Sequence, residues 1–168
     1  MRISLAILIL LSAFAARAQN DSLDAPYKRF PTIPPFDLLQ TDSSTHLTKD
    51  KIDQKRNTII MYFSPDCSHC QHQTEEMIKG MDSLKEVQIV MATYLPFEEM
   101  VDFYKKYQLV KYPNIKLGRD VKFFLPPYYR MKSLPYLALY KKGSLVTTYE
   151  GNQTVVTLVE AFDHKTIN

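Results

Sequence analysis

The stretch Thr58-Ile-Ile-Met-Tyr-Phe-Ser-Pro-Asp-Cys-Ser-His-Cys70 is the part of this chain that most strongly indicates its fold. Residues 58–63 are β-branched, apolar or aromatic, and Ser-Pro-Asp closes them at 64–66, which is typical of a buried strand that ends in a turn. From 68 to about 84 the apolar side chains recur at helical spacing opposite a polar face. Cys67 is therefore predicted at a strand-to-helix junction.

The rest of the chain continues this alternation of strands and helices. We expect a loop with at most one short helix or strand over 110–131, where prolines interrupt the pattern. The other predicted elements are a strand over 87–93, a helix from 96 to about 109, strands over 135–140 and 145–149, and a helix from 154 to about 164. The fold class is α/β: a central mixed sheet with helices on both faces, a C-terminal β-hairpin and a closing helix.

The N-terminus has the features of an export signal. An apolar run after Arg2 ends in Ala16-Arg17-Ala18, an A-x-A pattern, so residues 1–18 are predicted to be a signal peptide cleaved after Ala18. The apolar run is shorter than a bilayer span, and an uncleaved anchor is the alternative. Four prolines make 19–35 an expected extended lead-in without a helix. Residues 36–168 then form one domain, located in the periplasm or cell envelope.

Composition limits the classes of function. With 45% hydrophobic and 23% charged residues, the chain is typical of a globular domain. The formal net charge of +3 becomes +1 when Arg2 and Arg17 leave with the signal peptide. Such a balance excludes charge-driven nucleic-acid binding as a first interpretation.

Cys67 and Cys70 are the only cysteines, separated by Ser68 and His69. Two thiols at this spacing can form a small disulfide ring, and the backbone amides at a helix start favour a thiolate on the first. The expected chemistry is disulfide exchange, with Cys67 as the exposed nucleophile and Cys70 as the resolving thiol. His69 would tune the neighbouring thiolate through its partial positive charge.

Two other interpretations of this segment stay open. Cys67, His69, Cys70 and His72 lie within six residues and could handle copper or zinc, although structural zinc sites usually take a second pair of ligands from elsewhere in the chain. The cysteines could also form an inert disulfide in a non-catalytic interaction domain. Stoichiometric metal in reduced protein would support the first alternative, and a cysteine pair that cannot be cycled would support the second.

The order of these features resembles the thioredoxin-like superfamily. The resemblance rests on the strand before the motif, on Cys67-Ser68-His69-Cys70 at a helix start, and on Ser133-Leu134-Pro135 before a hairpin and final helix. With the signal peptide and the Pro-rich lead-in, the chain is most similar to the envelope-located TlpA/ResA-type thiol-disulfide oxidoreductases.

The resemblance implies several further properties. Pro135 would be a cis-proline beside the active site, and Leu134 would offer its backbone to an extended segment of the partner. No cofactor is implied beyond the redox-active disulfide of the motif. The expected partners are proteins with disulfides or thiols and an unidentified electron donor, with no nucleic acid and no stable membrane insertion after signal cleavage.

The chain also departs from that family. Asp66 stands where a tryptophan is common, and a carboxylate there disfavours a neighbouring thiolate. Met61 stands where many thioredoxins hold a buried acid, which leaves the proton transfer at Cys70 unexplained; Glu75 and Glu76 are the candidate substitutes. The Ser-His dipeptide resembles that of oxidants and isomerases, whereas the surrounding architecture resembles that of reductants, and we favour a reductant.

The middle of the chain is rich in aromatic residues, most of which are expected in the core. The segment Pro126-Pro127-Tyr128-Tyr129 precedes Pro135 in the sequence. Because it is rich in proline and tyrosine, we expect it to form part of a partner-binding rim.

Overall fold

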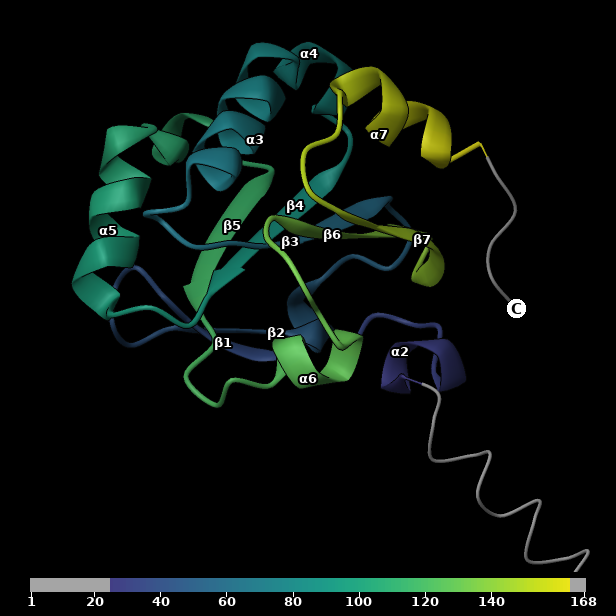
Figure 1. Cartoon of the computed structure of the whole chain (residues 1–168), viewed down its shortest axis with the longest axis horizontal. Coiled ribbons are helices and arrows are strands. Elements are labelled where there is room, and N and C mark those ends of the chain that lie inside the picture. The colour runs from purple at the N-terminus through teal and green to yellow at the C-terminus, as the bar shows by residue number, and fades with distance from the viewer. Residues whose placement is uncertain (1–24, 164–168) are drawn as a thin grey trace, which may run out of the picture.

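The computed structural model of the chain describes residues 25–163 and contains one mixed sheet with helices on both of its faces (Figure 1). The strands are β1 Asp37–Gln40, β2 His46–Thr48, β3 Thr58–Tyr62, β4 Gln88–Thr93, β5 Ile115–Arg119, β6 Tyr136–Lys141 and β7 Ser144–Glu150. The helices are α2 Pro26–Arg29, α3 Ser68–Lys79, α4 Met81–Leu84, α5 Phe97–Lys106, α6 Leu125–Tyr129 and α7 Val155–Ala161, with short 3-10 turns η1 Lys49–Lys51 and η2 Leu109–Lys111. This confirms the predicted fold class.

The sheet has the strand order β2-β1-β5-β4-β3-β6-β7. Strands β3, β4 and β5 are parallel, whereas β1, β2, β6 and β7 run antiparallel to their neighbours. The interior strand β3 pairs with β4 on one side and β6 on the other, and all five of its residues are buried. Such a run is expected of a strand covered on both faces.

Alternate residues of β3 serve two separate cores. Ile59 and Met61, together with Phe63 directly after the strand, pack in the cluster that also holds residues of α3, α5 and α7. Ile60 and Tyr62 face the other way, into a cluster with α6 and the segment before β1. Figure 1 shows the same division, with α3, α4 and α7 above the sheet, α5 beside it at the left, and α2 and α6 below it. No helix within residues 25–163 has the length and apolar character needed to span a bilayer.

Two of the expectations for irregular segments were wrong. Residues 19–35 include helix α2, because Pro26 occupies its first turn, where a missing N–H and a fixed φ cost nothing. Residues 110–131 contain η2, β5 and α6 instead of a loop with at most one short element. The β5 signal was weak because Gly118 interrupts a strand of five residues.

The expected partner-binding rim at Tyr128 and Tyr129 is also wrong. Both side chains are buried, with exposed fractions of 9% and 2%. The Tyr128 hydroxyl donates to the carbonyl of Phe30 at 3.0 Å, and the Tyr129 hydroxyl lies 2.5 Å from that of Tyr140. These rings therefore fasten α6 to the sheet and to the N-terminal segment. The predicted signal peptide, residues 1–18, lies outside the described residues.

A glycine separates the long helix of the motif from its continuation. The structure has two helices, α3 and α4, where one was expected from 68 to about 84, and Gly80 lies between them. A Cβ at Gly80 would come within 2.7 Å of Cγ2 of Val155 at the start of α7. The absence of a side chain here lets α7 pack closely against α3 and α4.

We expect Gly80→Ala to lower the free energy of unfolding by about 1–3 kcal/mol, because a methyl group has no room against Val155. Chemical denaturation measures the loss. In a double-mutant cycle, Gly80→Ala should cost less unfolding free energy in a Val155→Ala background than in the wild type, with a coupling energy of about 0.5–2 kcal/mol. Strictly additive losses would contradict close packing at this point.

Candidate active site

The motif lies at the turn between β3 and α3, as predicted. The amide of Phe63 still donates to the carbonyl of Ala92 on the next strand at 3.0 Å, which extends the ladder to the edge of the turn. The amide of Cys67 then donates to the carbonyl of Ser64 at 3.2 Å. Cys67 is the N-cap of α3, and its Sγ accepts the Cys70 amide at 3.4 Å. A sulfur in this position is stabilised by the helix terminus when it carries negative charge.

The two thiols differ sharply in exposure. Both cysteines are free, Cys67 is half-buried, and Cys70 has no exposed surface. Burial raises the pKa of Cys70 to about 12, with smaller contributions in the same direction from the Cys67 thiol and the Asp66 carboxylate. The Thr74 hydroxyl donates to the Cys70 carbonyl at 2.9 Å, so this turn of α3 is held firmly. Cys70 therefore stays protonated at neutral pH.

The Leu134–Pro135 peptide lies at the same end of the sheet as the motif. Tyr62, the last residue of β3, pairs with Tyr136 at the start of β6, which brings Pro135 level with Phe63. The Leu134–Pro135 bond is cis, and Leu134 packs against both hydrophobic clusters. The carbonyl of Pro135 accepts the Gly151 amide at 2.8 Å, which links this peptide to the segment after β7.

That segment also contacts the motif directly. The side-chain amide of Asn152 donates from Nδ2 to the His69 carbonyl at 2.6 Å, and its Oδ1 lies 3.1 Å from His69 Nδ1. Since Oδ1 can only accept, Nδ1 of His69 carries the hydrogen in this arrangement. The histidine ring, although exposed, is thus tied to the loop before α7.

A second pair of amides supports the first. The buried side chain of Gln73 donates to the Gln153 carbonyl at 3.1 Å and accepts the Gln153 amide at 2.7 Å. Gln73 lies one turn after His69 on α3. Four hydrogen bonds therefore join the first turns of α3 to residues 152 and 153.

The sequence did not single out these contacts. In the sequence, Asn152 is part of a formal Asn-Gln-Thr glycosylation sequon, and Gln73 is one of the polar residues of the predicted helix. No local pattern indicates that residues 80 or more positions apart exchange hydrogen bonds. A glutamine placed in line with the buried face of a helix is the one signal that was available.

The other predicted site residues occupy the exposed part of the turn. Asp66, Ser68 and His72 are exposed, and the Ser64 hydroxyl donates to the Asp66 carboxylate. Glu75 lies on the exposed side of α3, where it accepts from the Tyr107 hydroxyl at 3.3 Å, well away from the buried thiol.

The arrangement of the Cys, His and acidic side chains bears on the metal-handling alternative. Within residues 25–163, no group of three or more His, Cys, Asp or Glu side chains is placed so that it could hold an ion. Cys67 and Cys70 supply two sulfurs, while His69 is engaged with Asn152. The geometry of the described residues thus offers no support for the metal-handling alternative.

Comparisons with known proteins match this architecture at the level of structure. No family model matches the chain, and no curated protein matches it in sequence. Among solved structures, a thioredoxin candidate from Neisseria meningitidis superposes with a TM-score of 0.62 at 21% identity, covering 77% of this chain and 86% of that one.

Two further solved structures superpose to a similar degree. A secreted Mycobacterium tuberculosis disulfide oxidoreductase, described as homologous to Escherichia coli DsbE, gives a TM-score of 0.63 at 14% identity, covering 77% of this chain and 95% of its own. StoA from Bacillus subtilis gives a TM-score of 0.58 at 20% identity, and the superposition covers 78% of this chain and 98% of StoA. The strand order, the motif at the start of α3 and these superpositions together show that this chain has the thioredoxin-like fold.

Proposed function

We propose that this chain is an exported thiol-disulfide oxidoreductase of the TlpA/ResA type, which exchanges disulfides with partner proteins through Cys67 and Cys70. The observation that carries the proposal is the asymmetry of the two thiols. One is half-exposed at a helix N-cap, and the other is buried one turn behind it with a pKa of about 12. This asymmetry suits a nucleophile followed by a resolving thiol.

In the first step the Cys67 thiolate attacks one sulfur of a partner disulfide. The partner S–S bond breaks, a mixed disulfide forms with Cys67, and the other partner sulfur leaves as a thiolate. In the second step Cys70 loses its proton and attacks Sγ of Cys67. The second partner thiol is then released, so the partner gains two electrons and the Cys67–Cys70 disulfide holds the oxidised state.

The proton of Cys70 is the energetic obstacle in the second step. Met61 cannot accept it, and Glu75 lies on the exposed face of α3. The partner thiolate formed in the first step can accept this proton, so that this sulfur becomes a neutral thiol of the partner while the second partner sulfur is released from Cys67 as a thiolate. Formation of the mixed disulfide also removes the Cys67 thiol, which itself contributes to the high pKa of Cys70.

The partner would bind across the exposed turn. Leu134 precedes the cis bond and is level with the strand end that leads to Cys67, so its backbone can pair with an extended partner segment. Asp66, Ser68 and His69 border the same turn and would tune its redox balance. We assign no cofactor, and we place the protein in the periplasm or envelope because of the signal peptide predicted at residues 1–18.

We favour reduction of partner disulfides as the direction in vivo, with electrons supplied by an unidentified donor. A redox titration against graded thiol buffers, read by alkylation and mass, tests this. A midpoint at about −270 mV or below is expected for a reductant. A midpoint of about −180 to −120 mV would assign an oxidant or isomerase instead, and the lack of a reversible midpoint would indicate a non-catalytic domain.

The roles of the two cysteines are tested by trapping. Cys70→Ser should accumulate a mixed disulfide with a peptide that contains one disulfide, because nothing remains to attack Sγ of Cys67. Cys67→Ser is the matched control and should form no such adduct, since its remaining thiol is buried. Non-reducing electrophoresis and mass spectrometry measure the adduct. Capture by Cys67→Ser alone would reverse the assignment.

Asn152 is proposed as a positioning residue. Its two contacts to His69 are present in the dithiol form, so their loss should destabilise that form. Hydrogen bonds worth about 0.5–1.5 kcal/mol correspond to roughly 10–30 mV, so Asn152→Ala should lower the midpoint by that amount.

The control for this variant is Thr154→Ala, which removes the N-cap of α7 without touching the motif. It should reduce stability by about 1 kcal/mol and leave the midpoint unchanged. Equal midpoints for wild type and Asn152→Ala would mean that the contact supports both redox forms alike.

A further inference from the structure

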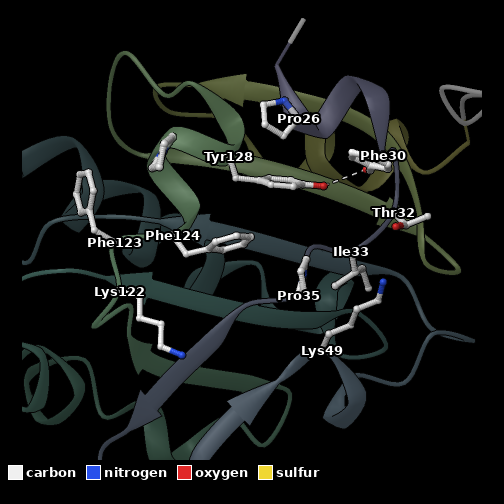
Figure 2. A pocket seen from close by; sticks show the side chains of 11 residues that line it. Pro26, Phe30, Thr32, Ile33, Pro35, Lys49, Lys122, Phe123, Phe124 and Tyr128 are labelled. Atoms are coloured by element: carbon white, nitrogen blue, oxygen red, sulfur yellow. Dashed lines mark hydrogen bonds between the residues drawn. The ribbon is translucent and has the colours of Figure 1, made fainter. Parts of the chain in front are cut away.

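An apolar pocket of about 770 Å³ lies on the face of the sheet opposite the motif helix. It opens between α2, the segment that follows it, η1 and the turn that leads into α6 (Figure 2). Its volume is within the range typical of sites for small organic ligands. The lining is dominated by rings and aliphatic side chains, chiefly Pro26, Phe30, Ile33, Pro35, Phe124 and Tyr128.

The walls of the pocket are held in place without a ligand. The Tyr128 hydroxyl donates to the Phe30 carbonyl at 3.0 Å, which ties α6 to the N-terminal segment across the pocket (Figure 2). At the base of α6 the buried Asp120 carboxylate accepts the amides of Phe124 and Leu125 at 2.9 and 2.8 Å. The cavity is therefore a built feature of this face and needs no rearrangement to form.

Apolar surface at this pocket is unusually open to solvent. Phe30 is 60% exposed and Phe123 is 49% exposed, and both line the opening. Large aromatic side chains left exposed around a preformed apolar hollow mark a surface that gains from being covered. A ligand with an apolar body would remove these rings from water.

The charged residues of the lining are both cations. Lys122 and Lys49 lie on either side of Pro35 in Figure 2. Lys122 has an exposed side chain and lies 3.3 Å from the Asp37 carboxylate, which is shared with His46. Lys49 has no such partner among the residues that the structure describes. The pocket is therefore lined by two lysines and by no acidic side chain, and of the two Lys49 is the one without a carboxylate partner among the described residues.

We propose that this pocket binds a single-chain alkyl carboxylate, with the chain among the aromatic and proline side chains and the carboxylate at Lys49 and Lys122. An alcohol of the same length would gain the apolar burial and leave the lysines unused, while a cationic amphiphile would be repelled. This site is separate from the thiol chemistry, because the sheet lies between the pocket and α3.

The test is an NMR titration of the purified protein with sodium decanoate, 1-decanol and decyltrimethylammonium, with the two ionic compounds kept below their micelle concentrations and the alcohol below its solubility limit. Decanoate should shift resonances of Phe30, Lys49 and Tyr128 and bind about 5- to 10-fold more tightly than decanol, as two exposed charge contacts allow. The cationic amphiphile should bind most weakly. Cys67→Ser should bind decanoate as the wild type does, so this result does not depend on the proposed oxidoreductase function.

Charge variants complete the test. Lys49→Gln combined with Lys122→Gln should abolish the preference for decanoate over decanol, whereas Lys105→Gln on α5, on the other face, should preserve it. Equal binding of decanoate and decanol by the wild type, shifts located elsewhere, or no binding of any of the three would overturn the proposal. Shifts that appear only when residues before Ala25 are removed would also overturn it, since the chain itself would then be the occupant.

Discussion

The arrangement of the whole site depends on one capping interaction, between Sγ of Cys67 and the amide of Cys70. An N-cap side chain must satisfy an amide that the helix cannot, and here a sulfur performs that task. Because the cap lies directly after a strand buried on both faces, its position is fixed relative to the sheet. The same geometry places the second thiol one turn deeper, inside the core. Exposure of one sulfur and burial of the other are two results of one local structure.

Much of this architecture could be read from local pattern. A regular pattern of apolar residues, long enough to identify the element, is present in β3, α3, β4 and the final hairpin. The turn at Lys142-Gly143 also has the positive φ values that a tight hairpin turn requires. The strands β1, β2 and β5 were missed because three to five residues carry too little period. The close approach of Gly118 to Leu38 that joins β5 to β1 is a tertiary contact.

The candidate site divides in the same way. The position of the cysteine pair at a strand-to-helix junction could be predicted from residue type and order, and the cis Leu134–Pro135 bond from the resemblance to thioredoxin-like proteins. The amide contacts of Asn152 and Gln73 could not, since they connect positions about 80 residues apart and depend on how α7 packs. Tyr128 was misjudged for a related reason: a tyrosine-rich segment has the same composition whether its rings face a partner or the protein's own N-terminal segment.

The hydrogen bond from the Gly151 amide to the Pro135 carbonyl links the two loops beside the motif, the one before β6 and the one after β7. In the proposed function, one loop would offer its backbone at Leu134, and the other loop holds His69 through Asn152. A partner that displaced the Leu134–Pro135 loop would therefore also displace the loop with Gly151 and Asn152, and through Asn152 the first turn of α3. Partner binding and thiol reactivity would then be coupled in this protein. The way a partner binds beside Leu134 would change the reactivity of the Cys67 sulfur that attacks that partner.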